Sequence, residues 1–184
     1  SFDHNLCDMI IGVSNKPKDT QGLLKKLKEN AQKSIETVKD KVTNFNLYDE
    51  ENINMYLHLD LLEDYLKPYF KAAVGNYKIT MDAKKEFLNS NLNIKKISEL
   101  MNSHHNYLKN NLKITTPEID KMIDVSFENG AIGSKIVGSG GGGSIVSLST
   151  NSNTSNKIVS ALKRVGVKDA FIARKGNGPT IYYE

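Results

Sequence analysis

The chain has 184 residues, of which 39% are apolar and 25% charged, and it carries a formal net charge of +4. These values exclude a disordered or fibrous chain, and no apolar run approaches the roughly 20 residues that span a bilayer. Arginine is nearly absent and the lysines alternate with acidic residues, so neither a nucleic-acid-binding stripe nor a membrane-bound protein is expected. The composition predicts one cytoplasmic domain.

The first part of the sequence predicts one strand followed by helices. Residues 6–13 form an apolar run with the β-branched content typical of a strand. After the break at Pro17, Asp19 or Thr20 can cap a helix whose apolar positions repeat every 3.6 residues from Leu23 to Val38. Further helices are expected at residues 51–66, from a cap at Thr80, across residues 94–108, and from the Thr116-Pro117 start signal.

The pattern changes after Asn129-Gly130, which is expected to end the last of these helices. Strands are predicted at residues 134–137 and 144–148, and a helix carries Ile158, Val159, Leu162 and Val165 on one face. Two more strands are expected at residues 168–173 and 180–183. The predicted fold is α+β: an antiparallel sheet with helices packed on one side and a helical insertion, in one domain that spans residues 1–184.

Seven of the 13 glycines fall in one short window, which ends in the loop Gly138-Ser139-Gly140-Gly141-Gly142-Gly143. An engineered linker would give such a run, but apolar strand-like segments adjoin both of its ends. The spacing also matches the dinucleotide fingerprint G-x-G-x-x-G, which requires a helix directly after the loop, whereas SIVSLS predicts a strand. A Walker-type phosphate loop is excluded because no Lys-Ser/Thr pair follows Gly143.

Two interpretations of the glycine loop remain. Consecutive glycines allow backbone amides to converge on an anion, which favours a ligand with a phosphate or carboxylate group. A purely structural tight crossing is the alternative, although four consecutive glycines cost more unfolded-state entropy than a simple turn requires.

The residues around this loop resemble those of a known family. GAIGSKIVGSGGGGSIVSLS, residues 130–149, is similar to the third conserved motif of the GHMP small-molecule kinases, a group that includes galactokinase, homoserine kinase, mevalonate kinase and phosphomevalonate kinase. The segments TTPEIDKMI and DMIIGVSNKPKDTQGLLKKLKE resemble stretches of the C-terminal half of these enzymes. MNSHHNYLKNNLKIT resembles a mevalonate kinase segment with an Asn-x-x-His pattern, in which Asn102 and His105 take the matching positions. The four consecutive glycines favour mevalonate kinase over galactokinase, whose usual pattern is Gly-Phe-Gly-Gly.

The resemblance implies a ferredoxin-like C-terminal domain of an ATP-dependent kinase that phosphorylates an alcohol, most simply mevalonate. Galactokinase, phosphomevalonate kinase, heptose-phosphate kinase and a non-catalytic module that binds a metabolite or partner are the alternatives. ATP and Mg²⁺ are the implied cofactors. The family's serine-rich ATP loop and catalytic aspartate belong to an N-terminal half that has no counterpart here, so this half is the implied partner and the chain alone is expected to be inactive. The resemblance also allows a homodimer.

Site residues follow from the same comparison of motifs. The loop residues Gly138 to Gly143 are expected near the transferred phosphate, while the catalytic residues are expected in the N-terminal half. Weaker candidates near the acceptor substrate are Ser14, Lys16, Lys135 and His105, each of which has an ordinary structural alternative. No metal site is expected, since His104 and His105 are adjacent on a helix and point about 100° apart. Val137 departs from the threonine or serine usual in the family and removes one hydroxyl.

Overall fold

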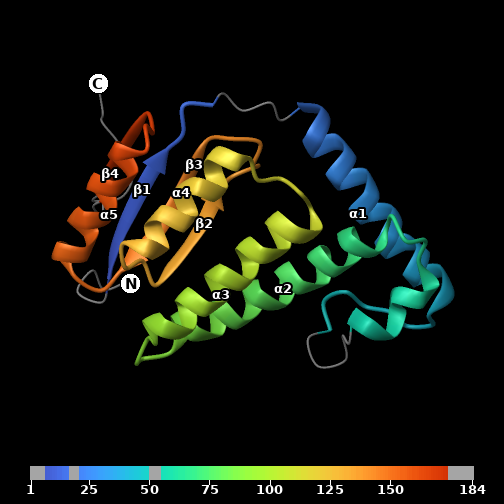
Figure 1. Ribbon diagram of the computed structural model, residues 1–184. Helices are drawn as coiled ribbons and strands as arrows, with labels where there is room; N and C mark the ends of the chain where they lie inside the picture. Colours follow the sequence, from blue (N-terminus) through green and yellow to red (C-terminus); the bar gives the residue numbers. More distant parts are fainter. Residues whose placement is uncertain (1–6, 17–20, 50–54, 174–184) are drawn as a thin grey trace, which may run out of the picture.

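The computed structural model describes residues 7–16, 21–49 and 55–173. Its centre is a four-stranded antiparallel sheet in the order β2-β3-β1-β4 (Figure 1). The strands are β1 (Asp8–Val13), β2 (Gly133–Val137), β3 (Ser144–Ser149) and β4 (Asp169–Ala173). The expected α+β architecture with an antiparallel sheet is confirmed, and so are four of the predicted strands. The expected strand at residues 180–183 and the expected caps Asp19 and Thr20 lie outside the described residues.

The helices of the structure are α1 (Gln21–Lys41), α2 (Lys67–Leu88), α3 (Ile94–Asn106), α4 (Pro117–Glu128) and α5 (Ser152–Arg164). Two short helical turns accompany them, the 3₁₀ turn η1 (Met55–Leu61) and the π turn η2 (Tyr107–Asn111). In Figure 1, α4 and α5 lie along the sheet, whereas α1, α2 and α3 form a separate helical layer beside it. This layer is the expected helical insertion.

The prediction of one helix over residues 51–66 and another that begins at Thr80 was wrong. The chain instead forms the short turn η1, and one long helix begins at Lys67 with a proline in its first turn, where the missing amide costs nothing. Thr80 lies inside α2, and its hydroxyl donates to the carbonyl of Asn76 at 2.7 Å. The hydroxyl therefore makes the internal bond that threonine can form within a helix rather than a cap.

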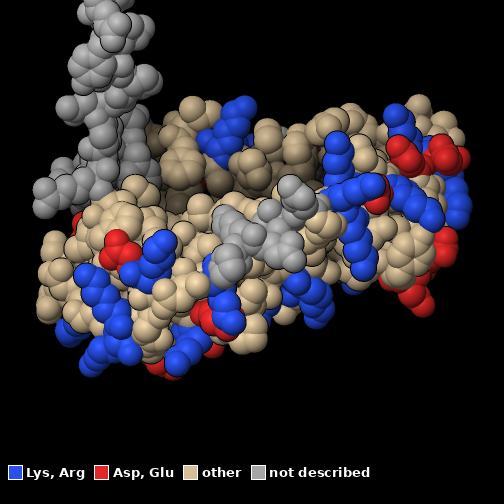
Figure 2. Space-filling view, turned by 90° about the horizontal axis from the view of Figure 1, so that it is seen from above, with Lys and Arg blue, Asp and Glu red and all other residues tan. Residues whose placement is uncertain are grey.

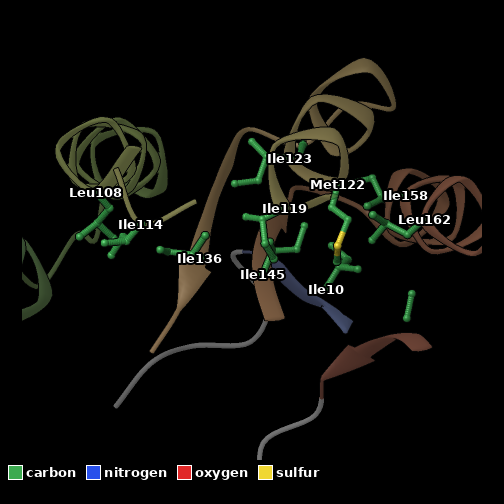
Figure 3. Close-up of a cluster of buried hydrophobic side chains, with 12 residues drawn as sticks. Ile10, Leu108, Ile114, Ile119, Met122, Ile123, Ile136, Ile145, Ile158 and Leu162 are labelled. Carbon is green, nitrogen blue, oxygen red and sulfur yellow. The ribbon is translucent and has the colours of Figure 1, made fainter. Parts of the chain in front are cut away.

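The main hydrophobic core lies between one face of the sheet and helices α4 and α5 (Figure 3). Paired residues of antiparallel strands point to the same face, so Ile136, Ile145 and Ala170 share a face with Ile10. Ile119 and Met122 of α4 and Ile158 and Leu162 of α5 fill the space above them. These two helices meet the expectation of helices packed on one side of the sheet.

The opposite face of the sheet is contacted at one edge by α3. Met9 of β1 and Leu148 of β3 are paired and pack with Ile97 of α3. The side chain of Asn102, also on α3, donates to the carbonyl of Ile132 at 3.2 Å and accepts from the amide of Ser134 at 3.0 Å. The helical layer is thereby joined to strand β2, which leads into the glycine loop.

A second core joins α1 to α2 and consists of Val38, Leu62, Leu66, Phe70 and Val74. Phe70 is completely buried there, and the ring of Phe45 packs against it with 6.1 Å between the ring centres. No helix in the described part of the chain is long and apolar enough to cross a membrane.

The start of α4 provides a test of the sequence-based capping argument. The Thr116 hydroxyl accepts from the amide of Ile119 at 3.3 Å, as the sequence predicts. Replacing Thr116 with alanine is expected to lower the free energy of unfolding by about 1 kcal/mol, because one free helix amide loses its acceptor. Urea denaturation measures this loss. Thr115→Ala, at the neighbouring position, is the matched control and should cost less; equal losses would contradict the capping role.

Candidate functional site

The glycine loop joins β2 to β3, and most of its residues have a backbone conformation that favours glycine. The φ angles are 79° at Gly138, 75° at Gly140, 67° at Gly141, 116° at Gly142 and 87° at Gly143. Side-chain-bearing residues adopt such angles only with strain. The glycine run is therefore explained by a series of left-handed conformations rather than by flexibility.

Gly140 is also required by a close backbone approach. A Cβ atom at this position would overlap the carbonyl oxygen of Ile114 and would lie 2.9 Å from the Ile114 Cβ. Ile114 belongs to the connection between η2 and α4, and its side chain is buried in the main core. The loop thus packs directly against a segment about 25 residues earlier in the chain.

Two backbone hydrogen bonds fix the glycine loop. The amide of Gly141 donates to the carbonyl of Ile114 at 2.8 Å, and the amide of Ser14 donates to the carbonyl of Gly143 at 2.7 Å. Among the described residues, the structure shows no hydrogen-bond acceptor for the other amides of the loop, which belong to Gly138, Ser139, Gly140, Gly142 and Gly143. Gly138 is exposed and Ser139 half-buried, whereas Gly140 and Gly142 are buried. Backbone donors of this kind can bind an anion, and the anion site expected from the sequence stays a prediction.

Of the weaker candidates after β1, Ser14 contacts the glycine loop and Lys16 contacts α4. Ser14 is buried, and its hydroxyl lies 3.4 Å from the carbonyl of Lys16. The Lys16 ammonium lies 3.4 Å from a carboxylate oxygen of Glu118, in the first turn of α4. The loop after β1 also lines a small pocket of about 160 Å³, together with Lys121, Met122 and residues 165–167. Ser14 is therefore adjacent to the glycine loop, whereas Lys16 is engaged in an exposed ion pair.

Lys135 is half-buried, and His105 is buried. The Lys135 ammonium donates to the carbonyl of Ile136 on its own strand at 2.8 Å, and burial lowers the pKa of Lys135. His105 is 5% exposed, and burial is the largest cause of its lowered pKa. Its Nδ1 atom has no hydrogen-bond partner. Asp120 opposes this shift and raises the His105 pKa, while Lys109 and Lys135 lower it further.

The neighbouring His104 gives a pH prediction. Its pKa is lowered to about 4, first by burial and then by Lys135 and His105. The unfolded chain binds a proton at the ordinary pKa of 6.5, so between about pH 6.5 and pH 4 the unfolded state holds more protons than the folded state. Stability is therefore expected to fall as the pH decreases through this window.

Urea denaturation at pH 7 and pH 5 tests this expectation. His104→Gln should lose less stability than the parent chain between the two pH values, because the glutamine cannot bind the proton. Equal losses in the two proteins would contradict the burial of a neutral His104.

The charged side chains visible in Figure 2 are of mixed sign. On the face seen in Figure 2, the lysine and arginine side chains are interspersed with acidic ones rather than forming a continuous stripe. Among the described residues, no group of three or more His, Cys, Asp or Glu side chains could hold a metal ion. The glycine loop therefore remains the principal candidate.

Sequence reasoning missed the segment that holds this loop. The π turn η2 and Lys113, which has a φ angle of 55°, shape the connection that carries Ile114. The periodicity of residues 94–108 predicts the helix that precedes this connection but contains no signal for a π turn. The polar run Lys109-Asn110-Asn111 marks only the end of a regular helix.

Comparison with known proteins places this geometry in context. Residues 84–168 match the family model described as GHMP kinases C terminal. The chain is 27% identical over 159 residues to a galactokinase of Clostridium perfringens, a match that covers 80% of this chain and 39% of that protein. A galactokinase of Dictyostelium discoideum is 36% identical over 59 residues, which cover 32% of this chain and 12% of that protein.

Solved structures share the fold. The Lactococcus lactis galactokinase, solved in complex with galactose, superposes with a TM-score of 0.77 at 23% identity over 95% of this chain and 47% of that one. The Methanococcus jannaschii mevalonate kinase gives a TM-score of 0.53 at 21% identity, over 94% of this chain and 41% of that one. The chain thus spans less than half the length of these relatives, and its fold is that of a GHMP kinase C-terminal domain.

Proposed function

We propose that this chain, which has the fold of a GHMP kinase C-terminal domain, is the C-terminal part of an ATP-dependent kinase that phosphorylates a sugar. The proposed acceptor is galactose. The proposal replaces mevalonate, the acceptor that the sequence motifs favoured. Galactose is supported by the matches to galactokinases along most of this chain and by the higher TM-score of the galactokinase structure.

The observation that carries the proposal is the row of unengaged amides in the glycine loop. Phosphoryl transfer depends on positioned donors around the transferred phosphate and on neutralisation of its developing charge. The amides of Ser139, Gly140 and Gly142 are already held in place by the two hydrogen bonds of the loop, so little reorganisation is needed to meet an anion. ATP with its cation would supply the phosphoryl group when bound.

The division of labour follows from what this chain contains. Its loop binds and orients phosphate oxygens, while Ser14, which is hydrogen-bonded to the loop, lies at the start of the segment proposed to face the acceptor. An N-terminal part of the same kinase is proposed to supply the catalytic aspartate, the second phosphate loop and the cation site. By itself, this chain then supplies groups that bind phosphate, and the N-terminal part supplies the groups that catalyse its transfer.

Two measurements test the proposal. The isolated chain, titrated with pyrophosphate, should show amide chemical-shift changes at Ser139, Gly140 and Gly142 and none at Gly130, which lies outside the loop. The isolated chain should also phosphorylate neither galactose nor mevalonate. Turnover by the chain alone would overturn the proposed division of labour.

The acceptor is tested in a polypeptide that carries both halves of the kinase. With ATP and a panel of galactose, mevalonate, phosphomevalonate and a heptose phosphate, galactose is expected to be phosphorylated fastest. Preference for mevalonate would overturn the proposed acceptor while leaving the kinase class intact, and binding without any transfer would favour a non-catalytic module.

A further inference from the structure

The connection between α3 and α4 has an unusual backbone. After α3 ends, the amide of Leu112 donates to the carbonyl of Tyr107 at 3.1 Å, which forms the wide π turn, and the amide of Ile114 donates to the carbonyl of Leu108 at 3.2 Å. Lys113, between these two donors, takes the left-handed conformation. Both features cost free energy relative to a regular helix end, and π turns occur frequently at functional sites.

The side chains of this connection are anchored in the main core. Leu108 and Ile114 are buried, and both belong to the cluster that contains Ile136 of β2. Figure 3 shows Leu108 and Ile114 beside Ile136, on the strand that leads into the glycine loop. The connection and the loop are therefore fixed to the same part of the core.

One carbonyl group links the connection to the loop. The Ile114 carbonyl accepts the hydrogen bond from Gly141 and also occupies the space that a side chain at Gly140 would need. Because this oxygen contacts two successive loop residues, a shift of Ile114 must move the loop or break the hydrogen bond. The position of the connection thus determines the position of the unengaged amides.

Helix α2 packs against the connection from its other side. A Cβ atom at Gly75 would overlap Cζ of Tyr107 and would lie 2.6 Å from its Cε2 and Oη atoms. Tyr107 is the first residue of the π turn, so its ring packs directly on the backbone of α2 only because residue 75 is glycine. The salt bridge between Lys109 and Asp120, at 3.2 Å, ties the same turn to α4.

We propose that Gly75 and Tyr107 are positioning residues for the glycine loop, and that they act through the π turn and the Ile114 carbonyl. The inference rests on the proposed function in assigning a phosphate to this loop. It adds that the helical layer sets the geometry of the phosphate site, although Gly75 is about 65 residues earlier in the sequence. Networks of this kind have to be established by measured coupling rather than by contact alone.

The first measurement is made on this chain without ligand. Gly75→Ala should lower the protection of the Gly141 amide against hydrogen exchange by about tenfold, because Tyr107 must move and the acceptor Ile114 moves with it. The matched control is Gly22→Ala, another glycine-to-alanine change within a helix, where a Cβ atom meets nothing within 4 Å. The double variant Gly75→Ala/Tyr107→Leu removes the obstructing ring atoms and should recover part of the protection of Gly141, because leucine relieves the overlap without reproducing all of the packing of the Tyr107 ring.

The second measurement is the affinity of the same variants for pyrophosphate. Weaker binding in Gly75→Ala, normal binding in Gly22→Ala and recovery in the double variant are the expected results. Unchanged protection of Gly141 in a folded Gly75→Ala chain would overturn the inference, and so would a double variant that shows no recovery. If protection of Gly141 falls while pyrophosphate affinity stays the same, the coupling stands and the phosphate-binding function of the loop fails.

Discussion

Replacement of Gly140 by alanine is expected to lower the free energy of unfolding by about 2 kcal/mol or more and to abolish measurable binding of pyrophosphate. The left-handed conformation alone costs a residue with a side chain roughly 1–2 kcal/mol. The added methyl group also overlaps the Ile114 carbonyl, a backbone atom that cannot move aside as a flexible side chain would. Urea denaturation measures the first effect and isothermal titration with pyrophosphate the second.

Gly166 provides the matched control for this substitution. It has a similar φ angle of 83°, but a Cβ atom there would meet nothing within 4 Å. Gly166→Ala therefore carries the cost of the backbone conformation without the collision, and the difference between the two variants isolates the contact with Ile114. Equal losses of stability, together with normal pyrophosphate binding by Gly140→Ala, would contradict the proposed role of this contact.

Replacement of Phe70 by alanine is expected to cost about 3–5 kcal/mol, the range for removal of a fully buried aromatic side chain. Phe70 is 0% exposed and joins α1, α2 and the turn η1 in the second core. The cavity cannot close easily, because residues from several elements surround the ring. Thermal and urea unfolding followed by circular dichroism measure the loss.

The control for Phe70 lies on the same helix. Phe87 of α2 is 50% exposed, so truncation to alanine there removes much less buried area. Phe87→Ala should therefore cost clearly less than Phe70→Ala. A Phe70→Ala chain as stable as the parent would show that the second core does not contribute to the cooperative unit that unfolds.

The sequence predicted those elements whose local signals agree with their packing. Strands β1 and β3 are short apolar runs without helical periodicity, and α4 has the Thr116-Pro117 start that the structure confirms. The first half of α2 was missed and a helix was predicted instead over residues 51–66, because Leu59, Leu62 and Leu66 have helical spacing although they lie in different local structures. Pro68 was the available signal for the true start of α2.

The site was predicted less completely than the fold. The run of glycines indicated a loop suited to an anion. The sequence does not show, however, that the contact with Ile114 requires a glycine at Gly140, or that the amide of Gly142 has no acceptor among the described residues. Nor could the partner segment be predicted, since Ile114 approaches the loop through a π turn and the left-handed Lys113. Such contacts depend on tertiary packing, which periodicity does not encode.

The side chain of Asn102 has a consequence for association between molecules. Strand β2 lies at the end of the sheet order, so its outer backbone groups would be free to pair with a strand from another chain. Asn102 already binds the amide of Ser134 in β2 and the carbonyl of Ile132, the residue just before the strand. Because its amide provides both a donor and an acceptor, it satisfies these positions as a neighbouring strand would. We therefore expect α3 to reduce the pairing of β2 with a strand from another chain.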